Sequence, residues 1–258
     1  MADRAYNPQD PADRRRLTKL FQVKATEIEM MTDQGYNIRS GFIMKPDRNW
    51  SDPVDLTLLQ DPRTTLDQKL AWREQYGVFL SRHTFSGLYQ HSQTLQYALV
   101  LYLNNEPKKK VKTGDFEIAR HFIGTNEIKT FIFISRNGLH STTANYCQNQ
   151  VAGRDIRLFM DADLAFNRTK HALAPIKAAR VPHRSAAEIE SDGVDPIADF
   201  IRTEGLEPRK LPLMMNSDFL AKWHGAKPGD VMVMEIMGTE TDTAGFYRNV
   251  HQAPSAKK

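Results

Sequence analysis

Cysteine is nearly absent from this chain of 258 residues, which has only one, Cys147. An internal disulfide requires two cysteines and a four-thiolate zinc site requires four, so the sequence excludes both. Because the chain cannot be held together by disulfides, we expect it to reside in a reducing compartment.

Long apolar runs are also missing. No stretch approaches the roughly 18 apolar residues that a membrane-spanning helix needs. The first residues, Met1-Ala2-Asp3-Arg4, lack the apolar segment of a secretory signal. We therefore expect the cytosol or the nucleus, with no membrane as a partner.

The sequence lacks the short strings that accompany common enzyme chemistry. It contains neither G-x-x-x-x-G-K-[ST] nor G-x-G-x-x-G, the glycine patterns that let backbone amides approach phosphates. None of its eight histidines forms an H-x-x-x-H pair. No G-x-S-x-G string is present, and Cys147 has no obvious partner in sequence. We expect no catalytic residue, no metal and no cofactor.

Two acidic patterns leave alternatives open. Asp161-Ala162-Asp163 offers two carboxylates to a magnesium ion, although capping of a turn explains the same string. Pro46-Asp47 and Glu127-Ile128-Lys129 together resemble the pattern of a metal-dependent nuclease, in which two carboxylates bind the metal and a lysine assists water attack. A nuclease is therefore the alternative from the enzyme class, and a free-standing DNA-binding regulator is the alternative among binding proteins.

The overall composition is that of a folded protein with a mixed surface. Hydrophobic residues make up 40% and charged residues 26%, and 35 basic against 31 acidic side chains give a net charge of +4. A polyanionic partner is permitted but not required. The densest basic run in the body of the chain, Lys108-Lys109-Lys110 with Lys112, is typical of a solvated turn and also suits phosphate contact or nuclear targeting.

The first half of the chain predicts helices over a sheet. Residues 1–13 are polar and contain two prolines, so we expect a mobile tail with order beginning near Asp13. Apolar residues then recur at helical spacing from Leu17 to Met31, and a second helix is expected from Thr65 to Tyr76. Runs rich in β-formers predict strands at 78–80, 97–103, 130–134 and 156–160.

The second half predicts a small α/β unit. We place the boundary between the halves after residue 165, and we interpret 178–194 as an extended or inserted loop because it lacks apolar periodicity. Asp195 and Pro196 predict the start of a helix that ends at Gly205. The remaining expectations are a strand at 211–215, a helix capped by Ser217 and ending at Gly225, and a strand at 231–237.

The N-terminal half resembles one protein family at two places. The first match is to the opening motif of the small subunit that eukaryotic RNA polymerases share and that has a shorter archaeal counterpart. The motif is matched in spacing at Leu20-Phe21, Thr26, Glu29-Met30, Asp33 and Gly35-Tyr36, with Phe21 in place of its tryptophan. Glu106-Pro107 and Val111-Lys112-Thr113 are similar to a second segment of that family. Both matches lie in what would be the jaw domain of such a subunit.

The C-terminal half resembles the archaeal-type domain of the same family. The start of that domain is matched at Asn167, Thr169, His171, Leu173 and Pro175. Its central motif is matched at Leu211-Pro212, Asp218, Ala221, Gly225, Lys227, Gly229 and Asp230, and its last motif at Thr239-Glu240-Thr241 and Ala244-Gly245-Phe246-Tyr247. Because the matches follow one another in order, the chain is identified as a divergent member, such as one encoded by a large DNA virus.

The resemblance implies a mixed α/β fold with two domains and a non-catalytic role. It implies a jaw domain of helices on a β-sheet at 14–165, an assembly domain at 166–251 and a short tail at 252–258. The implied partners are the largest subunit of a DNA-directed RNA polymerase, its other subunits and downstream double-stranded DNA, bound without sequence preference. The implied location is the nucleus, or a viral factory or virion.

The resemblance also implies two groups of site residues. A loop after the last jaw strand would approach DNA phosphates, and the assembly domain would meet the largest subunit. The DNA-contact residues would be Arg136, His140, Ser141, Thr142 and Thr143. The subunit-interface residues would be His171, Pro175, Leu211, Pro212, Gly245, Phe246 and Tyr247.

Overall fold

The computed structural model divides the chain into two compact units, Met1–Phe166 and Asn167–Lys258. It describes residues 5–45, 49–76, 80–103, 110–111, 127–140, 142–143, 154–171, 174–207, 210–237 and 243–252. The expected mixed α/β class is confirmed, since both units combine helices with a mixed sheet. The division lies one residue after the boundary that we placed from the sequence.

The N-terminal unit is built on a five-stranded sheet in the order β1-β2-β3-β4-β5. The first three strands are antiparallel, whereas β3, β4 and β5 run parallel. The carboxyl ends of these three strands therefore share one edge of the sheet, where ligands and functional loops commonly gather. The strands are β1 (Phe42–Ile43), β2 (Gly87–Gln90), β3 (Tyr97–Tyr102), β4 (Ile128–Ser135) and β5 (Asp155–Met160).

Three of the four strands expected in this unit are confirmed, at β3, β4 and β5. The fourth, at 78–80, lies mostly outside the described residues, and Leu80 does not belong to a strand. Strand β2 was missed because its four residues, Gly87-Leu88-Tyr89-Gln90, are too short for a clear alternation.

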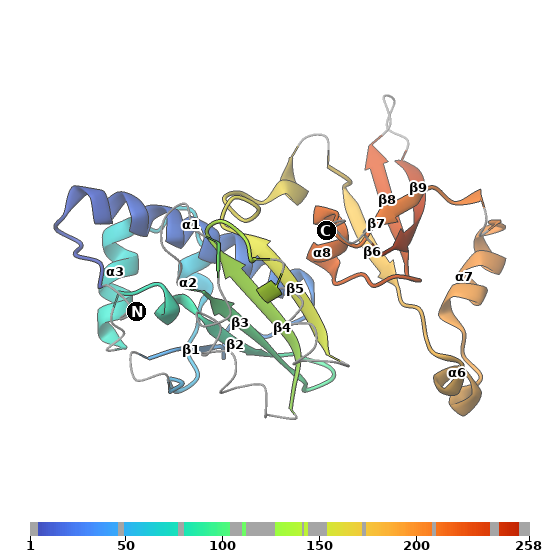
Figure 1. Ribbon diagram of the computed structural model, residues 1–258, viewed down its shortest axis with the longest axis horizontal. Helices are drawn as coiled ribbons and strands as arrows, with labels where there is room; N and C mark the ends of the chain where they lie inside the picture. The colour runs from blue at the N-terminus through green and yellow to red at the C-terminus, as the bar shows by residue number, and fades with distance from the viewer. Residues whose placement is uncertain are drawn as a thin grey trace. The chain divides into compact units, whose positions relative to one another are not determined.

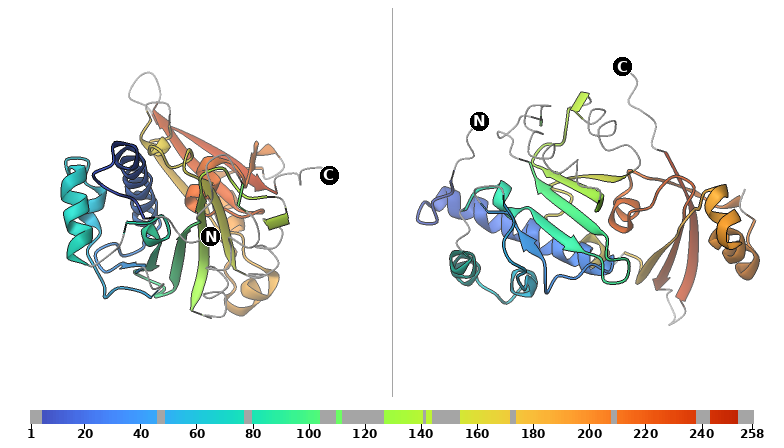
Figure 2. Two further views of the ribbon diagram at one scale, coloured as in Figure 1. Left: turned by 60° about the vertical axis from the view of Figure 1, so that its left-hand side comes forward. Right: turned by 90° about the horizontal axis from the view of Figure 1, so that it is seen from below.

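Helices cover one face of this sheet, with α1 lying along the strands and α3 outside it (Figures 1 and 2). Both expected helices are confirmed. Helix α3 opens with a capping box, in which Thr65 and Gln68 satisfy each other's backbone amides. The helices are α1 (Pro11–Asp33), α2 (Thr57–Gln60), α3 (Leu66–Gln75) and the 3-10 helix η1 (His83–Phe85).

The expected mobile tail at 1–13 is wrong for the residues nearest the helix. Helix α1 begins at Pro11, and the side chain of Asp10 accepts a hydrogen bond from the Ala12 amide. Tyr6 is only 9% exposed, and its amide donates to the carbonyl of Leu80 at 2.7 Å. An aspartate cap followed by proline at the first helical position fixes the start of a helix, and this signal outweighs the polar composition of the segment.

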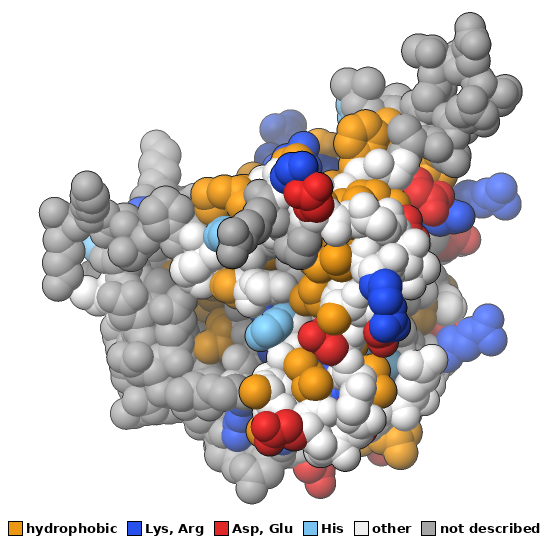
Figure 3. Space-filling model, turned by 90° about the vertical axis from the view of Figure 1, so that its right-hand side faces the viewer, with side chains coloured by type: hydrophobic (Ala, Val, Ile, Leu, Met, Phe, Trp, Pro, Cys, Tyr) orange, Lys and Arg blue, Asp and Glu red, His pale blue; other side chains and the backbone are white. Residues whose placement is uncertain are grey.

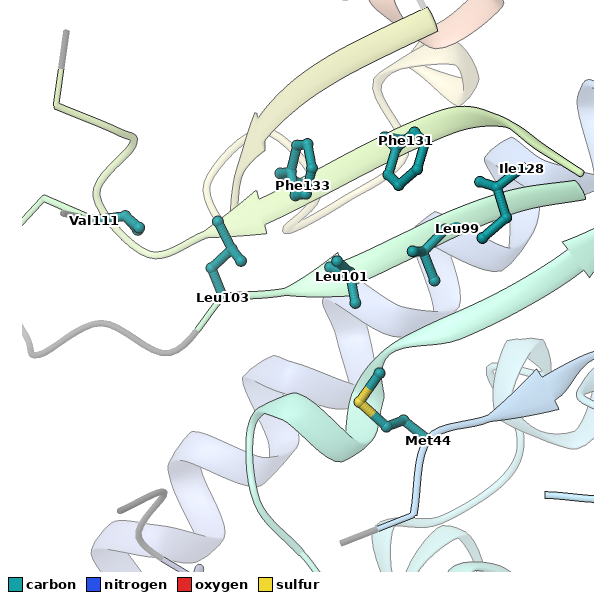
Figure 4. Packing of buried hydrophobic residues seen from close by; sticks show 8 residues of the cluster. All are labelled: Met44, Leu99, Leu101, Leu103, Val111, Ile128, Phe131 and Phe133. Carbon is teal, nitrogen blue, oxygen red and sulfur yellow. The ribbon is translucent and has the colours of Figure 1, made fainter. Parts of the chain in front are cut away.

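Both faces of the sheet are buried. Every residue of β4 except Lys129 is buried, as are five of the six residues of β3. On the face away from α1, alternate residues of β3 and β4 form an apolar cluster (Figure 4). Its members are Met44, Leu99, Leu101, Leu103, Val111, Ile128, Phe131 and Phe133.

Charged and phenolic groups lie buried between α1 and the sheet. The ammonium of Lys24 lies 2.7 Å from a Glu27 carboxylate oxygen and donates to the Tyr89 hydroxyl at 2.8 Å, and Tyr102 donates to the same Glu27 oxygen at 3.2 Å. Burial lowers the pKa of Lys24 in spite of its pairing with Glu27, and burial together with the Glu27 charge raises the pKa of both tyrosines well above 10. These contacts fix the position of α1 on the sheet.

The C-terminal unit has a four-stranded sheet in the order β6-β8-β9-β7. Strands β8 and β9 form a long antiparallel pair, β6 is antiparallel to β8, and β7 is parallel to β9. The elements are the 3-10 helix η3 (Arg168–Lys170), β6 (Lys177–Val181), α6 (Ala186–Asp192), α7 (Pro196–Glu204), β7 (Leu213–Met215), α8 (Phe219–His224), β8 (Val231–Met237) and β9 (Thr243–His251).

The expected loop at 178–194 is wrong, because β6 and α6 occupy most of it. A Ser185–Glu188 capping box starts α6, and Gly193, with φ of +70°, ends it. No residue of α6 is buried, which explains why the segment lacks an apolar period. The expected cap of the helix that ends at Gly225 is also wrong, since Asp218, and not Ser217, accepts the hydrogen bond at the start of that helix, α8.

The helix expected from Asp195 to Gly205 is confirmed as α7. Asp195 accepts hydrogen bonds from the amides of Ile197 and Ala198, and Gly205 ends the helix in the left-handed conformation. Helix α8 packs on one face of the sheet and covers a small apolar core. The core residues are Met214, Ala221, Ala226, Met232, Met234 and Val250.

Candidate functional site

The loop that follows β4 leaves the sheet at the edge where the parallel strands end. Gly138 turns the chain with φ of +74°, which favours glycine. The Val111 amide donates to the Gly138 carbonyl at 3.1 Å, and the His140 amide donates to the Val111 carbonyl at 3.1 Å. These bonds form a short parallel bridge between Val111 and Leu139 that fixes the course of the loop.

The structure separates the residues expected to contact DNA. Arg136 is half-buried and donates to the Tyr6 hydroxyl at 2.7 Å, whereas His140 and Thr142 are exposed. Thr143 is fully buried, so its hydroxyl does not face solvent and the expectation of a phosphate contact there is corrected. Ser141 lies outside the described residues. Among the described residues of this loop, the exposed polar side chains are those of His140 and Thr142.

A buried arginine joins the carboxyl ends of the three parallel strands. Arg82 Nε donates to the Leu103 carbonyl at 2.8 Å, and its Nη1 and Nη2 bind the two carboxylate oxygens of Asp161 at 2.8 and 2.5 Å. Its Nη2 also lies 3.4 Å from the Ile134 carbonyl. Because these partners follow or end β3, β4 and β5, Arg82 anchors the edge from which the loop at Arg136 departs.

The same contacts decide between the two interpretations of Asp161-Ala162-Asp163. Asp161 is occupied by Arg82, and the Asp163 carboxylate accepts a hydrogen bond from the Met160 amide at 2.9 Å. Both carboxylates thus stabilise the end of β5 and the turn after it. The structure favours capping over metal binding at this string.

The parts of a nuclease site are only partly placed. Glu127 and Lys129 are exposed at the start of β4, and Pro46-Asp47 lies outside the described residues. Within the described ranges, no group of three or more histidine, cysteine, aspartate or glutamate side chains is positioned to hold a metal ion. Cys147 and most of the basic run at 108–112 also lie outside the residues that the structure describes.

The C-terminal unit has an open groove of about 690 Å³ on the face of its sheet that carries α8. Three apolar residues that line it are largely exposed, Phe246 by 44% on this face, and Leu213 by 57% and Met215 by 40% at the edge strand β7, where alternation places their side chains on the face opposite to Met214. Large exposed apolar side chains gathered around one edge of a sheet are typical of a contact for another macromolecule. The groove is lined by Leu213, Met214, Met215, Ser217, Asp218, Leu220, Met234, Ile236, Phe246 and Arg248.

The residues expected at a subunit interface do not form one site. Phe246 lines the groove, whereas Tyr247 lies on the opposite face of β9, where its ring packs edge-on against Phe200 of α7 at 5.4 Å. A hydrogen bond to Glu204 at 2.8 Å raises the pKa of Tyr247. Of the other expected residues, Pro175 and Leu211 are half-buried, and the exposed ones are His171, Pro212 and Gly245.

Sequence reasoning missed most of the groove. Its residues on β8, Met234 and Ile236, were expected within a strand, and their alternate positions place them on one face. Arg248 and Phe246 share that face on β9, a strand that we did not predict. The missing information was the pairing of β7 with β9, which brings Leu213 beside Asn249 across 36 residues of sequence.

Figure 3 views the side on which Figure 1 draws α6 and α7, opposite the face that carries α8. Hydrophobic side chains form a broken band there, interrupted by acidic and basic groups of both signs. The three large apolar residues of α7, Ile197, Phe200 and Ile201, are half-buried. The charges on this side provide no field of a single sign.

Comparison with known proteins leaves the family open. No family model matches the chain, and a search of curated proteins finds no match. Within the described residues, no helix combines the length and the apolar character needed to cross a membrane.

Proposed function

We propose that this chain is a non-catalytic subunit of a multisubunit DNA-directed RNA polymerase. Its C-terminal unit docks on the largest subunit, and its N-terminal unit forms part of a jaw that contacts downstream DNA without reading its sequence. The observation that carries the proposal is the groove with exposed Leu213, Met215 and Phe246, which lies on the unit that begins at the subunit-like Asn167 motif.

The groove suits a protein partner for a physical reason. Covering an exposed aromatic or aliphatic side chain contributes on the order of 1.5–3 kcal/mol when burial is complete. A few such anchors near the centre of an interface account for most of its affinity. Phe246 and Leu213, roughly half exposed in the free chain, are placed to act as these anchors.

The loop after β4 suits a weaker contact with DNA phosphates. His140 and Thr142 offer an imidazole and a hydroxyl at the surface, and a phosphate contact by either group carries no information about a base. Contact with a few phosphates predicts a modest salt dependence, with a slope of about 0.9 for each phosphate neutralised. The isolated chain is therefore expected to bind duplex DNA weakly and without sequence preference.

Recovery of the tagged, full-length chain from its native host tests the assembly role. We expect stoichiometric polymerase subunits, including the largest one, and a strong loss of them for Phe246→Glu. Val194→Glu is the matched control, because Val194 is 46% exposed in the same unit but does not line the groove. Recovery of the chain without polymerase subunits would refute the proposal.

Crosslinking of the assembled enzyme to downstream DNA tests the jaw role. We expect His140→Ala with Thr142→Val to reduce crosslinks from this subunit, whereas Thr143→Val, at the buried neighbour, leaves them unchanged. Equal crosslinking by both variants would exclude the loop. Magnesium-dependent cleavage of DNA by the wild-type chain, lost in Glu127→Ala, would instead identify a nuclease, and sequence-specific binding by the isolated chain would identify a regulator.

A further inference from the structure

Among the strands that the structure describes, β7 forms one edge of the C-terminal sheet. It is the last strand in the order β6-β8-β9-β7 and runs parallel to β9. On the inner side, the Pro212 carbonyl accepts from the Asn249 amide at 3.0 Å, and the Asn216 amide donates to the His251 carbonyl at 2.8 Å. Since alternate residues of a strand bond to the same side, the amides of Leu213 and Met215 face outward.

The two edges of this sheet differ in how they are protected. The opposite edge, β6, carries Lys177 paired with Glu235, and Arg180, whose Nη1 donates to the Gly225 carbonyl at 2.6 Å. Charged side chains are a common means of preventing a further strand from adding to an edge. Strand β7 consists of Leu213, Met214 and Met215 and has no charge of its own. Of the two edges, β7 is the one that combines outward amides with exposed apolar side chains.

Charges of opposite sign flank the groove beside β7. Arg248 is half-buried in β9, and its Nη1 lies 3.5 Å from the Leu213 carbonyl, near the start of β7. Asp218 is exposed just beyond the end of β7, where its Oδ1 accepts from the Leu220 amide. A guanidinium has five donors, so Arg248 retains capacity for a carboxylate. Along the direction of β9, the groove therefore presents apolar Phe246, then cationic Arg248 near the start of β7, and then anionic Asp218 beyond the end of β7.

We propose that an extended segment of the largest polymerase subunit adds to β7 as a further strand. This segment has apolar side chains beside Leu213 and Met215, whose own side chains lie on the sheet face opposite to the groove, and one further apolar side chain that reaches Phe246 in the groove. An acidic residue of the segment faces Arg248 and a basic residue faces Asp218. Main-chain hydrogen bonds give such an added strand its affinity, and the side-chain pockets give it specificity. The inference rests on the proposed function and identifies the kind of segment that the groove binds.

A second copy of the chain suits this edge less well. Three residues of strand extend over only about 10 Å, and a stable dimer buries roughly 800 Å² on each partner. Pairing of two β7 strands alone therefore supplies too little contact. A segment from a subunit that also contacts the chain elsewhere acts at high effective concentration, so a short edge suffices.

Photocrosslinking of the assembled enzyme tests the occupant directly. The full-length chain with a benzoyl-phenylalanine at position 246 is recovered from its host and irradiated, and the crosslinked peptide is identified by mass spectrometry. We expect one segment of the largest subunit, with apolar residues, an acidic residue and a basic residue. A crosslink to a helix, to a second copy of the chain or to a segment without this charge pattern would overturn the inference.

Hydrogen exchange tests the strand geometry. The peptide that contains Leu213 and Met215 should exchange at least about ten times more slowly in the complex than in the free chain. Met215→Pro removes an outward amide without removing a bond to β9, so it should weaken assembly more than Met215→Ala does. Unchanged exchange of β7 while polymerase subunits still co-purify would refute strand addition and leave the proposed function intact. Absence of polymerase subunits would refute both.

Neutralising the charges of Asp218 and Arg248 tests whether they bind the added segment or only stabilise the fold of the unit. Asp218→Asn and Arg248→Gln should each speed dissociation of the complex by about tenfold at low salt, because a close charge pair at an interface contributes mainly to retention. Asparagine still caps a helix, so α8 is preserved, and Asp195→Asn is the matched control at the start of α7. Identical dissociation of the Asp218 and Asp195 variants would remove the anionic end from the proposal.

Discussion

Replacing Arg82 with methionine should destabilise the N-terminal unit more than any single surface change. The Arg82 side chain is 1% exposed and the Asp161 side chain is 28% exposed. The change removes one partner of a buried ion pair and also the donor to the Leu103 carbonyl. Loss of one partner costs about 3–5 kcal/mol for a buried pair, and because Asp161 is partly solvated we expect the lower end, about 3 kcal/mol.

The unfolding of the full-length chain in urea measures this cost. Trp50 and Trp72 report on the N-terminal unit and Trp223 on the C-terminal unit, so a Trp223→Phe background isolates the relevant transition. Arg14→Met is the matched control in the same unit, since both side chains of its ion pair with Asp67 are exposed and the pair should contribute less than about 1 kcal/mol. A cost for Arg82→Met no larger than that of the control would refute the role of Arg82 as the anchor of three strands.

The other predictions concern the pH response, a cap and a strained backbone. Tyr89 and Tyr102 have raised pKa values, so their contribution to stability is complete below pH 10 and is lost as pH rises beyond it. Absorbance at alkaline pH should show two tyrosines that ionise only when the protein unfolds. Replacing both Tyr89 and Tyr102 with Phe should remove this late ionisation. Asp195→Ala removes the acceptor of two amides and should cost about 1 kcal/mol in thermal unfolding of the C-terminal unit, whereas Asp195→Ser should cost little. Leu95 has φ of +58°, so Leu95→Gly should raise the free energy of unfolding by up to about 1 kcal/mol, and a decrease would contradict the strain.

The elements that were predicted correctly from the sequence have either strong apolar periodicity or a complete set of start and stop signals. Helix α7 has an aspartate cap, a proline at its first position and a terminal glycine, and all three act as expected. Strands β3 and β4 are continuous apolar runs because the sheet is buried on both faces. In these cases local preference and tertiary burial agree, so the local signal is sufficient.

The elements that were missed depend on partners distant in sequence. Strand β6 reads Lys-Ala-Ala-Arg-Val and becomes a strand because it pairs with β8, more than 50 residues later. The prediction of the candidate site from the sequence was incomplete for the same reason. That Thr143 is buried while Thr142 is exposed follows from packing, which the shared chemistry of the two threonines does not reveal.

The two proposed contacts differ in physical character, and salt should separate them. The loop near His140 would contact phosphates at the surface, where counterion release makes binding weaken steeply as salt rises. The groove around Phe246 would bury apolar area, which salt screens little, while its flanking charges at Arg248 and Asp218 are only partly screened once enclosed. Raising salt should therefore remove downstream-DNA crosslinks from this subunit before it releases the subunit from the enzyme. Simultaneous loss of both contacts would mean that assembly depends on surface charge, and the groove would then not be its main anchor.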